Sequence, residues 1–139
     1  MVEIAKDVYK GLKEEEITKM SLEEFANLCK ARPRRAILRA LSGENIKFMQ
    51  LIEKVRILKK KNHSKIKKGI KTHVRDAVII PEWLGLKFLV HNGKEWKPVE
   101  ITLEKLGHRL GEFSHTTIFT KHSGPGVGAT RGSKFISVK

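Results

Sequence analysis

Apolar residues recur at helical intervals in three stretches of the N-terminal half of this chain. Ser21 and Glu24 have the spacing of a capping box, which predicts that a first helix begins there. Pro33 ends this helix and suits the first position of a second one, which stops at Ser42-Gly43. A third amphipathic helix follows. The apolar positions of the three helices are Leu22, Phe25, Ala26 and Cys29, then Ile37, Leu38 and Leu41, then Phe48, Leu51, Ile52 and Val55.

Over residues 77–101 the pattern changes to that of strands. The run AVIIP predicts a buried strand, and LKFLVH alternates between two faces as a half-buried strand does. Asn92-Gly93 predicts a type I′ hairpin turn with positive φ at both residues, after which KEWKPVEI returns as the second strand. Because Pro98 cannot donate to a ladder, the returning strand is expected at a sheet edge.

After the hairpin, Thr102 is placed to cap a short helix, and Gly107 and Gly111 interrupt the sequence that follows. The chain therefore predicts an α+β fold. It combines a small antiparallel sheet of about three strands, short helices against it, a helical N-terminal extension and an irregular basic C-terminal tail. The expected parts are residues 1–69 for the helical extension with its basic segment, 70–122 for the α+β core and 123–139 for a flexible glycine-rich tail.

Charge is distributed very unevenly along the chain, whose formal net charge is +14. Residues 55–75 hold nine Lys and Arg and no acid, so this run would repel itself unless a polyanion neutralised it. Nucleic acid is therefore the favoured partner. A membrane surface is less favoured, because no amphipathic apolar stripe continues through the run. The cations of this run are Arg56, Lys59, Lys60, Lys61, Lys65, Lys67, Lys68, Lys71 and Arg75, and a second acid-free segment holds Lys121, His122, Arg131, Lys134 and Lys139.

Other classes of site find little support. The single Cys29 excludes an internal disulfide and a cysteine-based zinc site, and no apolar run is long enough to cross a membrane, so a cytoplasmic protein is expected. The six histidines lack zinc-ligand spacing, so neither a metal nor a cofactor is expected. No acid–base pair is evident among the carboxylates, so surface salt bridges to nearby lysines are the expected role of these side chains. The carboxylates considered are Glu95, Glu100, Glu104 and Glu112.

The glycine-rich stretch at residues 123–133 does not match a phosphate-binding loop of a nucleotide enzyme. Gly126 and Gly132 enclose five residues where that motif has four, and no strand pattern precedes them. Glycines with flanking cations instead predict a tail that is disordered alone and becomes ordered against RNA.

The segment NGKEWKPVEITLEKLGHRLGEFSHTT, residues 92–117, contains several short motifs at fixed spacing. They are Asn-Gly-Lys, Ile101, Leu-Gly, Leu-Gly-Glu-Phe and Thr116, and they resemble the signature of the universal small-subunit ribosomal protein family nineteen. The preceding segment KTHVRDAVIIPEWLGLKFLVHNGK is also similar to this family, so the shared core spans about residues 70–122. The N-terminal helices and the motifs HSGPGVGAT and KFI resemble its archaeal and eukaryotic branch.

The resemblance implies a structural, non-catalytic protein of the small-subunit head. It implies binding to the 3′ domain of the rRNA, contact with the neighbouring head protein of family thirteen, and a tail that reaches toward the decoding site and its tRNA or mRNA. Trp96 stands at a position where the family is variable, so we assign it to packing. The RNA contacts that the resemblance implies are Lys71, Thr72, His73, Arg75, His91, Asn92, Gly93, Lys94, Gly107, His108 and Arg109.

Two alternatives remain from the residues themselves. A free DNA- or RNA-binding protein, chromatin-like or chaperone-like, would use the same basic arms, and so would a basic nuclease. Sedimentation with the small subunit separates the first alternative from a ribosomal protein, and a test of RNA cleavage with added divalent metal separates the second.

Overall fold

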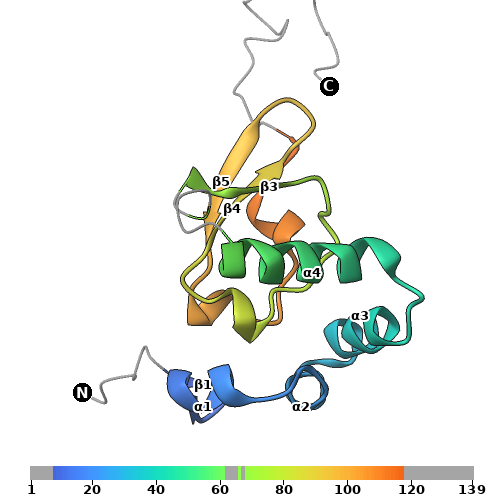
Figure 1. The fold of residues 1–139 in the computed structure, drawn as a ribbon, viewed down its shortest axis with the longest axis vertical. Helices are drawn as coiled ribbons and strands as arrows, with labels where there is room; N and C mark the ends of the chain where they lie inside the picture. The colour runs from blue at the N-terminus through green and yellow to red at the C-terminus, as the bar shows by residue number, and fades with distance from the viewer. Residues whose placement is uncertain (1–7, 62–65, 67, 118–139) are drawn as a thin grey trace, which may run out of the picture.

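The computed structural model describes residues 8–61, 66 and 68–117. Figure 1 shows a small sheet at one end of the molecule, helices α1–α3 at the other, and α4 between them. The helices are α1 (Glu14–Lys19), α2 (Leu22–Leu28), α3 (Ala31–Leu41) and α4 (Ile46–Lys61), with 3₁₀ turns η1 (Pro81–Trp83), η2 (Leu103–Lys105) and η3 (Leu110–Phe113). The strands are β1 (Val8–Tyr9), β2 (Leu12–Lys13), β3 (Ile70–Thr72), β4 (Lys87–His91) and β5 (Trp96–Glu100).

Helix α2 begins as the sequence predicts. Ser21 accepts a hydrogen bond from the backbone N–H of Glu24, whose carboxylate accepts one from the N–H of Ser21 in return. This reciprocal hydrogen bonding lowers the pKa of Glu24. At the other end of α2, the guanidinium of Arg34 donates to three carbonyl groups, those of Ala26, Asn27 and Cys29. These bonds satisfy carbonyls at the end of α2 and connect α2 to α3.

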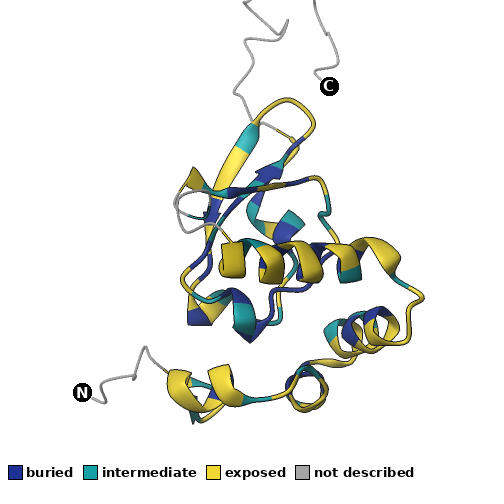
Figure 2. Cartoon of the chain, in the orientation of Figure 1, coloured by how far each residue is buried: buried dark blue, intermediate teal, exposed yellow. Residues whose placement is uncertain are grey.

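Helix α3 begins two residues earlier than predicted, because Pro33 is its third residue and not its first. The first-turn N–H groups of a helix have no partner within the helix, so a proline is tolerated there. The helix ends at Leu41, and Gly43 follows with a φ of +85°, as predicted from Ser42-Gly43. In α4 all four predicted apolar positions are buried. Figure 2 shows that the opposite face of α4 is exposed.

The sheet has three strands in the order β3-β4-β5, but it is mixed and not wholly antiparallel as predicted. β4 and β5 are antiparallel, whereas β3 runs parallel to β4, with Ile70 opposite Phe88. A parallel pair needs a long crossover connection, and residues 73–86 provide it. The edge position predicted for Pro98 is confirmed, since β5 is an outer strand.

The apolar run of residues 77–80 is buried, but it is not a strand of this sheet. It forms one isolated bridge, between Val78 and Arg109, and its backbone pairs with the loop that follows η2. The N–H of Ile79 donates to the carbonyl of His108 at 2.8 Å, and the carbonyl of Ile79 accepts from Gly107 at 3.0 Å. The sequence predicted burial correctly and the hydrogen-bonding partner incorrectly, because an apolar run does not specify which backbone lies beside it.

The hairpin turn between β4 and β5 also differs from the prediction. His91 pairs with Trp96, so the loop has four residues, and among the described residues Lys10 alone combines a positive φ with a side chain. Asn92 therefore does not adopt the type I′ conformation. Instead its Oδ1 accepts the N–H groups of Lys94 at 2.9 Å and Glu95 at 2.6 Å, which is local capping by an asparagine side chain.

The buried apolar side chains form one core that includes both the N-terminal helices and the sheet. Phe48 from α4 lies edge-on to Trp83, which in turn contacts Phe88 of β4. On β4 the side chains alternate between buried and half-buried, as predicted. The second face of the sheet is consequently left for polar and aromatic side chains.

Candidate nucleic-acid interface

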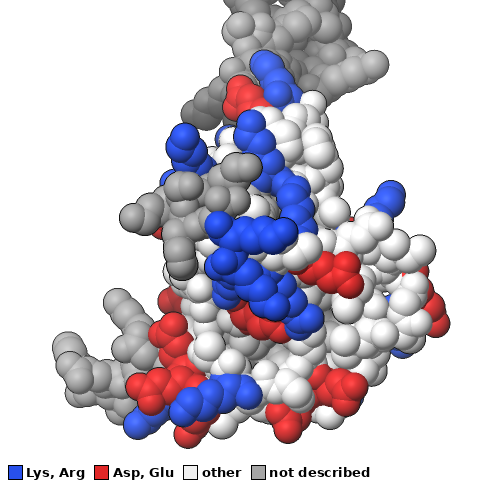
Figure 3. Space-filling model, viewed as in Figure 1, with Lys and Arg blue, Asp and Glu red and all other residues white. Residues whose placement is uncertain are grey.

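Basic side chains gather over α4 and along the sheet, as Figure 3 shows, while many of the acidic ones lie at the end of the molecule formed by α1 and α2. This separation gives the described part of the chain a cationic face, which is the electrostatic footprint of a protein that binds a polyanion. The exposed cations of α4 and of the sheet with its hairpin are Lys47, Lys54, Arg56, Lys59, Lys60, Lys61, Lys71, Lys94 and Lys97.

A groove of about 240 Å³ lies between α4 and the segment that begins with β3. Lys47 and Lys54 line it from α4, and Lys71 and His73 line it from the other side. The ammonium group of Lys54 lies 3.4 Å from the carbonyl oxygen of Lys71, so the two sides of the groove are in direct contact. Three ammonium groups and an imidazole around one groove are suited to phosphate groups.

Two of the predicted RNA-binding cations of α4 make bonds within the protein. Arg56 donates to both carboxylate oxygens of Glu82, at 2.9 and 2.6 Å, and Lys59 donates to the backbone carbonyl of Glu82. The hydrogen bonds from Arg56 lower the pKa of Glu82, against the opposing effect of burial, and the nearby charges of Arg56 and Lys59 lower it further. These bonds connect α4 to η1. Lys60, Lys61 and Lys68 are exposed.

Aromatic rings cover the end of the sheet next to the groove. The ring centroids of His73, His91 and Trp96 lie 4.8–4.9 Å apart in all three pairs. The ammonium group of Lys71 lies 5.4 Å from the Trp96 ring centroid, within the range of a cation–π contact. The packing role predicted for Trp96 is confirmed by these contacts, and His73 remains exposed beside it.

Several predicted contact residues use their polar atoms inside the protein. Thr72 is buried, and its hydroxyl accepts the N–H of Val74 at 3.1 Å. Asn92 is buried and caps the hairpin, as described above. His91 accepts the N–H of Gly93 through Nδ1 at 3.0 Å. At the hairpin tip, Lys94 is exposed, which leaves its ammonium group accessible to RNA.

Arg75 connects three segments of the fold. Its half-buried guanidinium donates to the carbonyl of His91 at 2.6 Å, to that of Gly111 at 3.1 Å and to that of Ser114. These carbonyls belong to the end of β4 and to the region of η3. The geometry gives Arg75 a structural role.

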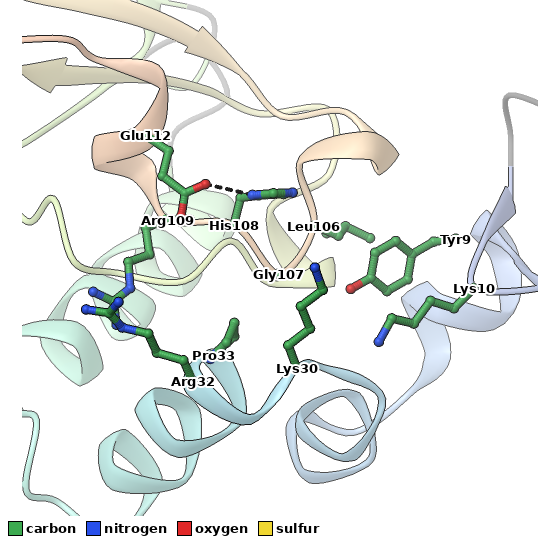
Figure 4. Close-up of a pocket in the computed structure, with 10 residues that line it drawn as sticks. All are labelled: Tyr9, Lys10, Lys30, Arg32, Pro33, Leu106, Gly107, His108, Arg109 and Glu112. Atoms are coloured by element: carbon green, nitrogen blue, oxygen red, sulfur yellow. Dashed lines mark hydrogen bonds and ion pairs between the residues drawn. The ribbon is translucent and has the colours of Figure 1, made fainter.

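The loop at residues 107–109 lies apart from the groove and faces the N-terminal helices (Figure 4). His108 lies 2.6 Å from a carboxylate oxygen of Glu112, and the other oxygen accepts the N–H of Arg109 at 3.1 Å. Partial burial raises the pKa of Glu112, but these hydrogen bonds and the neighbouring charges outweigh it and lower that pKa overall. These hydrogen bonds favour the ionised form of Glu112.

Some predicted contacts lie outside the described residues, namely Lys65, Lys67, Lys121, His122, Arg131, Lys134 and Lys139. Within residues 8–61, 66 and 68–117, no three His, Cys, Asp or Glu side chains are grouped so that they could hold a metal ion. No helix in the same part of the chain is long and apolar enough to span a membrane.

Sequence reasoning missed two cations of the groove, Lys47 and Lys54. They precede the acid-free run, so the charge pattern did not single them out. Their separation by seven positions places both on one face of a helix, which was the available signal.

Comparison with family models identifies a family whose model matches this chain. The model described as Ribosomal protein S19 matches residues 39–122, which is more than half of the sequence. The matched region includes α4, the sheet, the groove between them and the loop at residues 107–109. It leaves β1, β2, α1, α2 and most of α3 outside.

Proposed function

Because the chain belongs to the ribosomal protein S19 family, we propose that its basic face binds the 3′ domain of the rRNA in the head of the small subunit. Members of this family are structural, non-enzymatic constituents of the small ribosomal subunit and bind its rRNA. The chain is therefore a component of the ribosome with a role in translation. The 3′ domain as the part of the rRNA that is bound, and the basic face as the surface that binds it, are what we propose beyond membership of the family.

The groove between α4 and β3 is the observation that best supports this proposal. It brings Lys47, Lys54 and Lys71 together from segments on either side of residues 62–67, and His73 and Trp96 lie at its end. An RNA backbone in the groove would meet the ammonium groups, and an unpaired base beside it would meet exposed ring surface. Both kinds of contact are typical of structured RNA with single-stranded loops.

The proposal also includes two partners and a compartment. The neighbouring head protein of family thirteen contacts this chain in the cytoplasmic ribosome, and residues 123–139 reach toward the decoding site and its tRNA or mRNA. The composition of that segment supports its part of the proposal: glycines allow close backbone approach, and four cations in residues 121–139 favour phosphate neighbours. This segment lies outside the described residues.

The test is binding of the full-length protein to a 3′-domain rRNA fragment over a range of salt concentrations. Each cation that neutralises a phosphate contributes roughly 0.7–0.9 to the slope of log affinity against log salt. The double variant Lys54→Gln/Lys71→Gln should therefore flatten the slope by about 1.4–1.8. The matched control is Lys13→Gln/Lys19→Gln, which removes the same charge from exposed positions near the acidic end.

An equal slope for the groove variant and its control would show that the groove does not face RNA. The alternative of a free nucleic-acid-binding protein is addressed by sedimentation of cell extracts at moderate salt. A ribosomal constituent migrates with the small subunit, whereas a free binder follows bulk nucleic acid. Migration away from the subunit would contradict the proposed function as a whole.

A further inference from the structure

A second basic site lies where the N-terminal region faces residues 106–112 (Figure 4). The loop at residues 107–109 is called the core loop below. It is a cavity of about 660 Å³. Tyr9 and Lys10 line it from the first hairpin, Lys30 and Arg32 from the start of α3, and Arg109 from the core loop. Three of its cations, Lys10, Lys30 and Arg32, precede the region that matches the family model.

The two walls of the cavity are held together by close packing. A Cβ atom at Gly107 would lie 2.9 Å from the phenol oxygen of Tyr9, so Tyr9 sits directly on the backbone of the core loop. Burial raises the pKa of Tyr9 to about 12, and the adjacent Cys29 thiol raises it in the same direction. Tyr9 therefore remains a neutral side chain that can donate a hydrogen bond. Tyr9 thus connects the first hairpin to the backbone at Gly107.

The balance of charge in the cavity favours an anionic ligand. Among the described residues, Lys30, Arg32 and Arg109 make no ion pair with a carboxylate, and Lys10 donates to the carbonyl of Leu28. Glu112 is the one acidic residue that lines the cavity, and His108 and the backbone of Arg109 already occupy its oxygens. Four cations around one concave space repel one another unless an anion enters.

The shape and the donors of the site favour an RNA backbone over an acidic peptide. Arg32 and Arg109 project toward the same side of the cavity (Figure 4), and guanidinium groups bind phosphate through paired donors. The volume lies in the range of pockets that enclose whole small molecules, so it has room for a sugar as well as a phosphate.

We propose that this cavity binds a segment of rRNA backbone, so that the N-terminal region supplies a contact with RNA in addition to the groove beside α4. The inference rests on the proposed function, since it assumes that the ligand of the basic face is rRNA. It assigns Lys10, Lys30 and Arg32 to RNA binding, and it makes the N-terminal hairpin part of a binding site.

The experiment compares two double variants of the full-length protein. Lys30→Gln/Arg32→Gln removes two cations from the cavity, and Lys19→Gln/Arg35→Gln removes two exposed cations elsewhere in α1 and α3. The cavity variant should flatten the salt slope of rRNA binding by about 1.4–1.8, and the control should flatten it by much less. Hydroxyl-radical footprinting of the rRNA should show that only the cavity variant loses one short protected stretch. Thermal unfolding of both variants tests that each remains folded.

The outcomes separate this inference from the proposed function. If the unmodified protein showed no salt-dependent binding to rRNA, both the proposed function and the role of the cavity would be overturned. A slope and a footprint equal to those of the control, in a protein whose α4 groove still responds to substitution, would overturn only the cavity. Binding of poly-glutamate by the unmodified protein but not by the cavity variant, with rRNA binding unchanged, would assign the cavity to an acidic protein segment instead.

Discussion

Gly111 and Gly93 are both glycines of the matched region, and each is needed for a different physical reason. The N–H of Gly111 donates to the carbonyl of Arg75 at 2.8 Å, and a Cβ there would lie 2.9 Å from that oxygen. Gly93 has open space around it, but its φ of +105° is one that side chains rarely adopt. A side chain at position 111 is therefore excluded by the neighbouring backbone, whereas a side chain at position 93 is disfavoured by the backbone conformation.

We expect Gly111→Ala to destabilise the protein by about 1–3 kcal/mol, as inserted methyl groups do in tightly packed positions. Gly93→Ala should cost about 1–2 kcal/mol, the usual penalty for a left-handed residue with a side chain. Chemical denaturation of both variants measures the free energy of unfolding. A Gly111→Ala protein as stable as the unmodified one would show that the chain near Arg75 moves aside.

The roles of polar residues were the hardest feature to predict from sequence. Arg75, Thr72 and Asn92 were all predicted to contact RNA, and all three make hydrogen bonds inside the protein. A sequence shows which side chains can donate or accept. The carbonyl groups that accept hydrogen bonds from Arg75, however, belong to segments distant in the chain. Lys60 and Lys71 are exposed and needed no such information, since the charge run alone singled them out, whereas Lys94 was predicted from the family resemblance.

At the scale of elements, α4 is held against the rest of the fold by two kinds of interaction. Its apolar face is buried in the shared core, and Arg56 forms a two-point ion pair with Glu82 of η1. The pair is partly exposed, so it contributes less than a fully buried one would. Its effect on stability should depend on pH, because only an ionised Glu82 accepts both hydrogen bonds.

The bonds from Arg56 lower the pKa of Glu82 below its ordinary value of 4.5. The stability that this pair contributes is therefore fully present above about pH 4.5 and is lost as pH falls through the lower pKa of the folded state. Glu82→Gln should be less stable than the unmodified protein at pH 7, by no more than about 1 kcal/mol. The difference should shrink below pH 4. Thermal unfolding of both proteins between pH 3 and pH 7 measures it, and a constant difference would contradict the assignment.

Helices were predicted more accurately than strands because their signals are local. The capping box at Ser21 and the apolar spacing of α4 each lie within one element. β3 has only three residues within the basic run, too few for a visible alternation. The first hairpin was not predicted at all. Its turn has positive φ at both Lys10 and Gly11, the conformation that had been predicted for Asn92-Gly93.

At the scale of the whole molecule, one apolar core connects residues from Ile17 to Leu110. Helices α1–α3 alone bury few large side chains, and they depend on contact with α4 and the sheet region. The cavity at Gly107 follows from this arrangement. Sequence reasoning did not bring Lys30 and Arg109 together, because their proximity arises only when the N-terminal region docks on the core loop.

Deletion of residues 123–139 should leave the thermal stability of the free protein nearly unchanged. Residues 123–133 offer only Val127 as a sizeable apolar side chain, which is too little to anchor a core. The shortened protein should still enter the small subunit, while tRNA affinity or decoding accuracy falls. Assembly with truncated protein, followed by tRNA-binding and misreading assays, tests this expectation. Unfolding or failed incorporation would mean that Phe135, Ile136 or Val138 packs against the core.

The parallel pairing of β3 with β4 also sets an order of events during folding. Formation of the β4–β5 hairpin closes a loop of four residues. Pairing of β3 with β4 closes a much longer loop, the crossover at residues 73–86. Short loops close at lower entropic cost, so the hairpin should form early and β3 should dock late. Substitutions in the hairpin should then slow folding, and substitutions in β3 should mainly speed unfolding. Because Lys71 lies in β3, the groove beside α4 would gain this ammonium group only at the late docking step.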